Sequence, residues 1–339
     1  MAYIRGFILK YREIRFVFSC LVQDLIYIIK DYKSLAHAAR CKDVDTVFVC
    51  SISFFDKEKW QVISQAKLWK KFYKKSNVVI CGSKISYFLF FKNKKIICSL
   101  EPFYNAPPIK FRKTHKKVIL FVSDSHSKSW LNNYILKNNV TDILTPYKKT
   151  LLRLGYANRL GIDNIHSFPW CVEESMLNVS GPKSYSPKVL GFGKTGLKSG
   201  VYDQREWAIK SGLVESFDYA GSGNQALKGN DYFKWLREYD ACVVAMSTNE
   251  IYNYTVAKYF EIASQGLLLF AFPTVDLEDF GFSDGKNCIF VNRETFQRKI
   301  LEYSANPSAY LDVRKNAVTL IKENHTISHR IKQLEEIAS

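Results

Sequence analysis

The sequence predicts an α/β protein with two doubly wound domains, and three observations lead to this prediction. From residue 44 onward, short apolar runs typical of buried parallel strands alternate with helix-like segments. A proline-containing stretch without periodicity, residues 167–187, interrupts this alternation near the middle of the chain. A second alternation of the same kind begins at residue 188. With 339 residues, the chain is long enough for two domains that each have their own core.

The first half contains the apolar runs expected to form one parallel sheet. These runs are Thr46–Ser51, Val78–Cys81, Ile96–Ser99, Val118–Val122, Ile143–Leu144 and Ile165–Phe168. Lysine-rich helical stretches such as Lys57–Lys75 separate the early runs. Residues 1–40 are also expected to be helical, with basic residues among apolar ones. Either a basic-surfaced helix packed on its own domain or a helix lying on a membrane surface accounts for that pattern.

The charge of the chain limits its partners. Its formal net charge is +17, while hydrophobic residues at 47% and charged residues at 24% are values of a globular protein. The excess of positive charge implies an anionic partner: nucleic acid, an acidic membrane surface or a phosphorylated substrate. No apolar stretch is long enough to span a bilayer. We therefore expect a cytoplasmic protein, with peripheral attachment to the inner membrane face as an option.

The cysteines indicate buried thiols. The chain has 8 cysteines but no C-x-x-C pair, and most of them lie in or beside apolar runs. This usage favours a reducing compartment and indicates neither a disulfide framework nor a zinc site. No pair of carboxylates has a convincing spacing for another metal, so we expect no metal centre.

Candidate catalytic residues follow one of the apolar runs of the first half. Asp124 and His126 come directly after Val118–Val122, which places them at the carboxyl end of a buried strand, where open α/β sheets bind ligands. A carboxylate there can accept a proton from an acceptor hydroxyl. Glu101, which follows an earlier run, is the reserve carboxylate. The alternative is that Asp124 and the serines around it serve only as turn and cap residues.

A glycine-rich loop opens the second half. The strand-like run Lys188–Leu190 leads into G-F-G-K-T-G, in which Gly193 and Lys194 are central. Such a loop lets the backbone approach a diphosphate, although the same G-x-G-x-x-G pattern also occurs in dinucleotide folds. Arg205, at the start of the next helix, would face phosphate oxygens. Gly221, after the following strand, is a candidate seat for a nucleotide base.

The stretch Tyr252–Gly266 predicts a helix with a binding role. Thr255 is its expected N-cap and Gly266 its expected stop. Lys258 and Glu261 lie three residues apart and therefore share a face. A cation in the first turn opposes the helix dipole unless an anion binds there, and Glu261 can accept hydrogen bonds from vicinal hydroxyls. An ordinary surface pair is the alternative; an anion clamp beside a diol acceptor is what a sugar nucleotide requires.

The pattern Lys-x-x-Glu-x-x-(small)-x-Gly followed by an apolar run resembles the donor-site helix of GT-B glycosyltransferases, most closely their "glycosyl transferases group 1" type C-terminal domain. The resemblance implies that Glu261 holds the ribose hydroxyls. Many retaining members carry a second Glu eight residues earlier, which here is Asn253. Asp124 is similar to the Asp that acts as base in some inverting GT-B enzymes, including a phage DNA β-glucosyltransferase. The donor-binding residues implied in this way are Gly193, Lys194, Arg205, Gly221, Tyr254, Thr255, Lys258 and Glu261.

The resemblance also sets expectations for the whole molecule. We expect the GT-B fold, with two Rossmann-like domains at residues 1–175 and 186–320, a cleft between them, and residues 321–339 as a helix that crosses back. The donor would be a UDP-sugar, or else a GDP-sugar, with no tightly bound cofactor. The acceptor would be a glycan or lipid-linked glycan in cell-surface polysaccharide or glycolipid synthesis. DNA is the alternative acceptor. A non-catalytic nucleic-acid-binding protein and an NAD-dependent oxidoreductase are the competing classes.

Overall fold

The computed structural model describes residue 22 and residues 44–51, 63–75, 77–102, 105–123, 131–161, 163–179, 187–196, 200–217, 227 and 229–339. The predicted helix of residues 1–40, apart from residue 22, lies outside these described residues. Asp124, His126 and Gly221 also lie outside them.

The described residues of the first half form one parallel sheet of six strands in the order β2-β1-β3-β4-β5-β6. The strands are β1 (Thr46–Val49), β2 (Val78–Cys81), β3 (Ile96–Ser99), β4 (Lys117–Phe121), β5 (Asp142–Thr145) and β6 (Ile165–Ser167). All four residues of β1 are buried, as expected for the central strands of a sheet covered on both faces. Each predicted run is therefore a strand; Val78–Cys81 and Ile96–Ser99 have the predicted ends, and the ends of the others are shifted by one or two residues.

Helices and short turns connect these strands. They are α3 (Ile63–Tyr73), α4 (Lys84–Ser86), the π-helical turn η2 (Tyr87–Phe91), α5 (Leu131–Lys137), α6 (Lys148–Arg153), α7 (Ala157–Leu160) and η4 (Glu174–Met176). Trp69 of α3 is a central core residue, since its ring stacks on Phe48 with a centroid distance of 5.4 Å and on Phe168 at 6.0 Å. These aromatic contacts join α3 to both β1 and the end of β6.

The second half forms a separate parallel sheet, whose described strands follow the order β11-β10-β9-β7-β8. The strands are β7 (Val189–Phe192), β8 (Glu215–Phe217), β9 (Ala241–Val244), β10 (Leu268–Ala271) and β11 (Ile289–Phe290). The helices are α8 (Asp203–Lys210), α9 (Gly229–Leu236), α10 (Ala257–Ser264), η5 (Glu278–Phe280), α11 (Phe296–Ala305), η6 (Pro307–Tyr310), α12 (Leu311–Asn324) and α13 (Ile327–Ala338).

Helices cover both faces of this second sheet. Apolar residues of α9, α10 and α12 pack with Leu190 and Phe192 of β7 in one core cluster. Residues of α8 and α11 pack with Val189 in another cluster. Alternate residues of one strand thus enter opposite cores, as the two-residue period of a strand requires. The sheet is doubly wound, as the alternation of strands and helices predicts.

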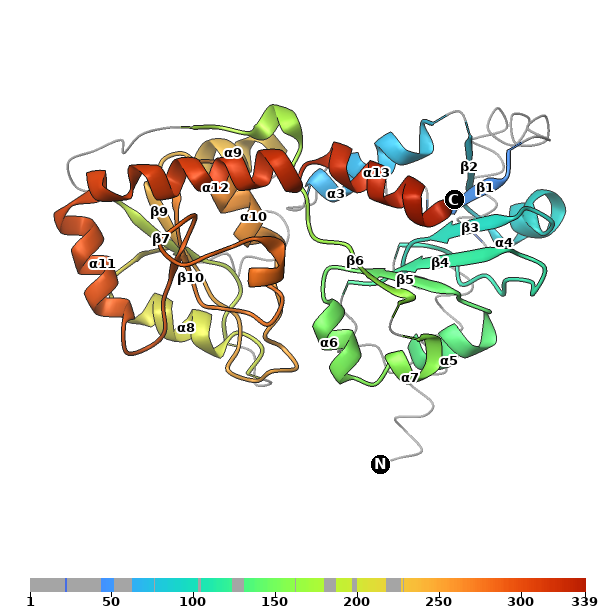
Figure 1. Cartoon of the computed structure of the whole chain (residues 1–339), viewed down its shortest axis with the longest axis horizontal. Helices are drawn as coiled ribbons and strands as arrows, with labels where there is room; N and C mark the ends of the chain where they lie inside the picture. The colour runs from blue at the N-terminus through green and yellow to red at the C-terminus, as the bar shows by residue number, and fades with distance from the viewer. Residues whose placement is uncertain are drawn as a thin grey trace.

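The last helix returns to the first half of the chain. Ile327, Ile331 and Leu334 of α13 are buried in the hydrophobic core of the first sheet. Polar contacts support this position: the Lys117 ammonium donates to the carbonyl oxygen of Ile337 at 2.7 Å. In Figure 1, α12 lies over the second sheet and α13 continues past it to lie beside α3. The predicted crossing helix is therefore present.

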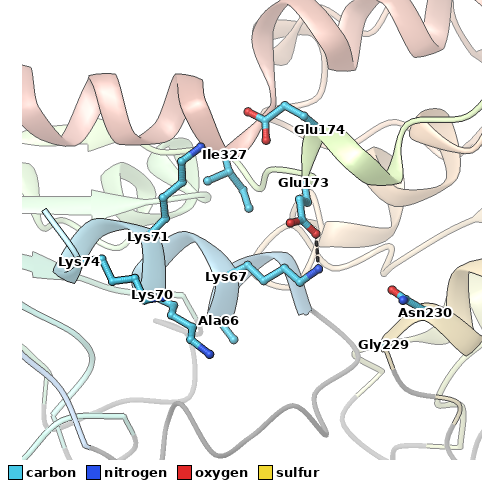
Figure 2. A pocket seen from close by; sticks show the side chains of 10 residues that line it. All are labelled: Ala66, Lys67, Lys70, Lys71, Lys74, Glu173, Glu174, Gly229, Asn230 and Ile327. Atoms are coloured by element: carbon cyan, nitrogen blue, oxygen red, sulfur yellow. Dashed lines mark hydrogen bonds and ion pairs between the residues drawn. The ribbon is translucent and has the colours of Figure 1, made fainter.

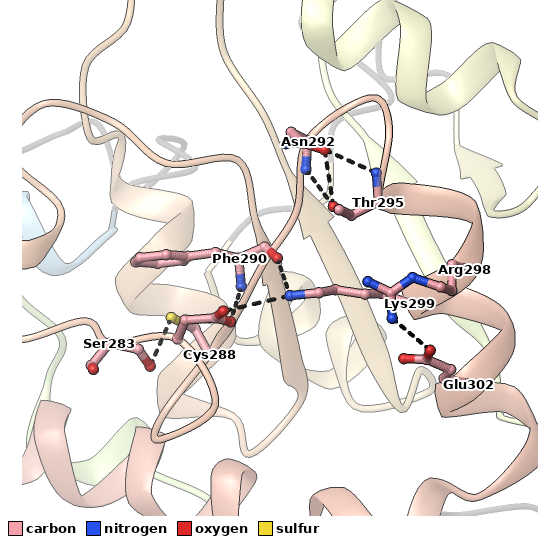
Figure 3. A network of polar contacts seen from close by, with 9 residues as sticks. Ser283, Cys288, Phe290, Asn292, Thr295, Arg298, Lys299 and Glu302 are labelled. Carbon is pink, nitrogen blue, oxygen red and sulfur yellow. Dashed lines mark hydrogen bonds and ion pairs between the residues drawn. The ribbon is translucent and has the colours of Figure 1, made fainter.

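A turn between η5 and β11 shows how polar groups close the edge of the second sheet. The Asp284 carboxylate accepts a hydrogen bond from the backbone N–H of Phe290 at 2.7 Å, and Lys299 of α11 donates to the Phe290 carbonyl at 2.8 Å (Figure 3). Gly285 has a positive φ of 70°, which a glycine adopts without strain. Asp284 and Gly285 therefore lie in a tight turn beside β11.

Three further expectations concern the domain boundaries, the cysteines and membrane spans. The domain boundaries at residues 175, 186 and 320 stay predictions. In the described part of the chain, Cys50, Cys81, Cys98, Cys171, Cys242 and Cys288 are free and buried. None of the helices found there combines the length and apolarity needed to cross a bilayer.

Candidate functional site

The carboxyl edge of the second sheet gathers most of the described candidate residues. Because parallel strands all end at the same edge, the loop after β7 and the first turn of α10, which follows β9, meet there. Gly193 immediately follows β7, Arg205 lies in the first turn of α8, and Lys258 lies in the first turn of α10. Three segments that are far apart in sequence therefore contribute to one site.

Arg205 is buried at this edge. Only 7% of its surface is exposed. Its guanidinium donates to the carbonyl oxygens of Ala245 and Lys194, both at 3.2 Å, and lies 4.3 Å from the centre of the Tyr202 ring. Burial disfavours the charged form and lowers the pKa of Arg205. Arg205 is therefore not a solvated residue on the helix surface.

Lys258 lies against the same glycine loop. Its ammonium donates to the carbonyl oxygen of Phe192 at 3.0 Å and lies 3.8 Å from the centre of the Phe192 ring. Burial of the ammonium, together with the nearby charge of Arg205, lowers the pKa of Lys258 well below its ordinary value. Gly193 makes this approach possible: a Cβ built there would clash with the Lys258 ammonium and lie 3.1 Å from an Arg205 nitrogen.

Glu261 is the buried carboxylate of the site. Its side chain is 4% exposed, and one carboxylate oxygen accepts a hydrogen bond from the Tyr232 hydroxyl of α9 at 3.0 Å. Burial raises the pKa of Glu261 to about 7, although the Tyr232 hydrogen bond and the Lys258 charge act in the opposite direction. A buried carboxylate with raised pKa beside a buried cation is typical of a functional site. The surface-pair interpretation of Lys258 and Glu261 is therefore wrong.

The expected N-cap of α10 is wrong. Val256 occupies the cap position and makes no side-chain capping bond. The Thr255 hydroxyl is instead hydrogen-bonded to the Thr274 hydroxyl, and its carbonyl accepts from the Trp170 indole N–H at 3.0 Å. Thr255 is thus engaged by residues distant in sequence, and its hydroxyl is not directed at the first turn of the helix.

Tyr254 joins the two halves of the chain beside this helix. Its ring lies 4.5 Å from that of Tyr147, which precedes α6 of the first sheet. The neighbouring Trp170 ring lies 6.1 Å from Tyr147. These aromatic residues form part of one small buried cluster between the two sheets. The segment that leads into the candidate donor helix is thereby held against the first half of the molecule.

The electrostatic character of the site follows from these positions. Among the described residues, neither Arg205 nor Lys258 forms an ion pair with a carboxylate. Two cations therefore converge beside a glycine loop, at the first turn of a helix whose leading N–H groups have no intrahelical partner. Placing an anion between them would relieve both their mutual repulsion and their desolvation. The arrangement is suited to binding a phosphate or diphosphate.

The described candidate of the first sheet is Glu101. It follows β3, is 3% exposed, and accepts hydrogen bonds from both the backbone N–H and the hydroxyl of Ser123, the latter at 3.3 Å. Ser123 ends the described segment that contains β4, and Asp124 is the next residue in the chain. The Glu101 carboxylate therefore holds the backbone that leads into Asp124. Asp124 and His126 themselves are not placed by the described residues.

A cavity of about 590 Å³ lies between the two halves (Figure 2). It is bounded by α3, by Glu173 and the start of η4, and by the starts of α9 and α13. Lys67 forms an ion pair with Glu173 across it. Gly229 and Asn230 line its other side, in the first turn of the helix that supplies Tyr232 to Glu261. The residues lining it are Ala66, Lys67, Lys70, Lys71, Lys74, Glu173, Glu174, Gly229, Asn230 and Ile327.

Sequence reasoning missed Tyr232 and Trp170. Tyr232 lies 29 residues before Glu261, and no local pattern around it indicates a carboxylate partner. Trp170 lies in the proline-containing stretch without periodicity, where a tryptophan gives no sign of the carbonyl that it contacts 85 residues later. Both contacts depend on how distant elements pack, so no spacing of residues along the sequence could have predicted them.

Comparison with known proteins gives a family match for the second half of the chain. Residues 204–336 match a family model described as glycosyl transferase-like. This part of the chain is therefore similar to a glycosyl transferase-like domain. The matched residues include Arg205, Lys258 and Glu261. The chain matches none of the curated proteins.

Solved structures support the fold of most of the chain. TarM aligns with a TM-score of 0.53 at 15% identity, covering 75% of this chain and 57% of TarM. HepE from Anabaena, solved with UDP and glucose, aligns with a TM-score of 0.55 at 9% identity, covering 87% of this chain and 99% of HepE. Sucrose-phosphate synthase from Thermosynechococcus elongatus aligns with a TM-score of 0.50 at 8% identity, covering 75% of each chain. These similarities confirm the predicted GT-B fold.

Proposed function

We propose that this protein transfers a sugar from a nucleotide-sugar donor to an acceptor hydroxyl. The observation that carries the proposal is the convergence of Arg205 and Lys258 around Gly193, beside the buried carboxylate of Glu261. The cations would bind the donor diphosphate and Glu261 would accept hydrogen bonds from the ribose hydroxyls. Because the HepE structure contains UDP and glucose, a UDP-sugar is the first donor to test.

The chemistry assigns a task to each group. As the bond between sugar and phosphate breaks, its electron pair goes to the leaving diphosphate, and preorganised cations stabilise that charge. Asp124 would take the proton of the acceptor hydroxyl, which gives an inverting reaction. Glu101 would serve as a positioning residue, because its carboxylate is engaged by Ser123. The lysine-rich cavity between the halves suits a glycan or lipid-linked glycan acceptor that carries anionic groups.

Ligand binding tests this proposal directly. Thermal shifts would be measured with UDP, GDP, a CMP-sugar and NAD on the wild type, Lys258→Met and Glu261→Gln. Losing one charge-assisted hydrogen bond weakens binding by roughly 10- to 100-fold. We expect one nucleoside diphosphate to stabilise the wild type and each variant to lose affinity on that scale. Lys210→Met and Glu302→Gln, which change exposed ion-paired residues of the same types, are the matched controls.

Two results would overturn the proposal. Absence of a shift with every nucleotide would leave a non-catalytic, polyanion-binding protein as the better interpretation. Stabilisation by NAD that Lys258→Met does not change would instead indicate an oxidoreductase.

A further inference from the structure

The outer end of the first sheet carries a group of exposed apolar side chains. Ile85 is 39% exposed, Phe88 57%, Leu89 60% and Phe90 38%. The other exposed large apolar residues of the described chain occur singly along the sequence, and such isolated residues are normal on a soluble surface. Exposed apolar residues that gather in one place mark an interaction site. Four within six consecutive positions therefore require an explanation.

The local structure holds these side chains outward. Tyr87 and Phe91, at the two ends of η2, are 5% and 1% exposed and anchor the turn in the core. The Tyr87 hydroxyl is hydrogen-bonded to the His115 ring at 2.6 Å and accepts from the Arg112 backbone N–H at 3.0 Å. Residues 88–90 lie between these anchors. They cannot turn inward unless Tyr87 or Phe91 leaves the core, so their exposure is part of the fold.

Cations surround the apolar group. The Lys92 ammonium lies 4.6 Å from the centre of the Phe88 ring, and the Arg112 guanidinium lies 6.0 Å from it. Lys84 directly precedes Ile85. Between residues 82 and 117, the acidic residue in the sequence is Glu101, which is buried and bonded to Ser123. The rim of the patch is therefore cationic, with no acidic side chain from this segment to neutralise it.

We propose that this docking patch, formed by Ile85, Phe88, Leu89 and Phe90 with Lys84, Lys92 and Arg112, binds the surface of an anionic lipid bilayer. Apolar side chains would enter the boundary between headgroups and acyl chains while long cationic side chains reach the lipid phosphates. The inference goes beyond the proposed transfer reaction, because the patch lies on α4 and η2, at the end of the first sheet remote from the second (Figure 1).

The chemistry of the patch favours lipid over other partners. Phe88 and Phe90 offer rings on which a nucleic-acid base could stack, but Ile85 and Leu89 in the same patch are aliphatic and are matched by acyl chains rather than by bases. A second copy of the chain would bring the same cations to the contact and repel the first. A bilayer of anionic lipid accepts both the aliphatic side chains and the positive charge. Among the described residues no helix is able to span the bilayer, so the attachment would be peripheral.

Vesicle sedimentation tests the patch. The full chain would be mixed with vesicles of phosphatidylcholine alone and of phosphatidylcholine with phosphatidylglycerol. We expect binding to the mixed vesicles that salt weakens. Phe88→Ser/Leu89→Ser should lower it roughly tenfold or more, since two inserted apolar side chains are lost. Lys92→Gln should lower it about fivefold.

The matched control for the apolar change is Leu136→Ser/Leu301→Ser, which alters residues that are 62% and 53% exposed elsewhere. It should retain wild-type vesicle binding. Equal loss in this control, or full binding by Phe88→Ser/Leu89→Ser, would overturn the proposal. The proposal would also be overturned if Phe88→Ser/Leu89→Ser weakened self-association or duplex DNA binding and left vesicle binding unchanged. The nucleotide-induced thermal shift should be the same in all these variants, which separates this test from that of the donor site.

Discussion

Glu261 combines two demands on one side chain. In the ligand-free protein its carboxylate is buried, and the Tyr232 hydroxyl is its hydrogen-bond donor in the described structure at 3.0 Å. Ribose hydroxyls would add donors to the same oxygens and favour the ionised form. The ionised Glu261 side chain therefore destabilises the folded protein but favours ligand binding. Such a loss of stability is common in preorganised binding sites.

The raised pKa of Glu261 predicts how stability changes with pH. Since the folded carboxyl titrates at about 7 against an ordinary 4.5, the folded state holds its proton more tightly than the unfolded state. The contribution of Glu261 to the free energy of unfolding should then be highest below pH 4.5, fall as pH rises to 7, and stay level above it. Glu261→Gln should lack this decline and exceed the wild type at pH 8 by at most roughly 3 kcal/mol.

Denaturant unfolding of both proteins at pH 5 and pH 8 measures this difference. Asp276, whose pKa burial raises to about 6, titrates in both proteins and cancels in the comparison. Glu302→Gln, at an exposed ion pair, is the control and should follow the wild type. An equal decline in the wild type and in Glu261→Gln would show that Glu261 is not the titrating group.

At the scale of elements, the loop after β7 and the first turn of α10 form one unit. The Phe192 carbonyl accepts from Lys258, and the Lys194 carbonyl accepts from Arg205 of α8. Each cation is thus oriented by a backbone oxygen of the glycine loop. Gly193 has a φ of 114° and leaves the space that both cations occupy. Glycine suits this position for two reasons: the backbone has a positive φ, and the two cations approach the backbone closely.

Gly193→Ala should therefore disturb the site more than another glycine replacement does. The added Cβ would force Lys258 aside and place a non-glycine residue at positive φ, with a strain of about 1–3 kcal/mol. We expect a lower melting temperature and a loss of nucleoside diphosphate affinity. Gly196→Ala is the matched control: Gly196 also has a positive φ, 71°, but a Cβ added there would meet no atom within 4 Å. Calorimetric titration of both variants should show loss of affinity for Gly193→Ala alone; equal losses would attribute the effect to backbone strain.

At the scale of the molecule, α13 ties the two halves together. Leu334 is fully buried in the core of the first sheet, although its helix follows α12 of the second half. Lys75 of the first half forms an ion pair with Glu335, and Lys149 donates its backbone N–H to Asp276 of the second half at 3.1 Å. Contacts therefore join the halves through both the returning helix and the start of α6.

Leu334→Ala should destabilise the whole protein, because truncating a buried leucine costs about 2–5 kcal/mol. Thermal and denaturant unfolding would measure the loss, and the first half should become more sensitive to proteolysis. Leu301→Ala, at a residue that is 53% exposed, is the control and should change stability by at most about 0.5 kcal/mol. A loss as small as that of the control would mean that α13 contributes little to the fold of the first half.

Much of the fold and part of the site could be predicted because they are encoded locally. Most strands of both sheets follow from apolar runs such as Val78–Cys81, which the structure reproduces residue for residue. Gly266, the expected stop of α10, has a positive φ of 71° just after the helix ends. Thr255 shows the limit of local prediction. Its position in the sequence predicts an N-cap, but its hydroxyl is hydrogen-bonded to Thr274 of a later loop instead.

The sequence by itself determined the two parallel sheets, the glycine loop and the common face of Lys258 and Glu261, since spacing along one element settles these features. Only the tertiary structure decided that Arg205 reaches the same glycine and that Tyr232 donates to Glu261. It alone decided that the apolar turn at Phe88 stays exposed. These features depend on which distant surfaces meet. Burial and hydrogen bonding between distant segments produce no periodic pattern in the sequence.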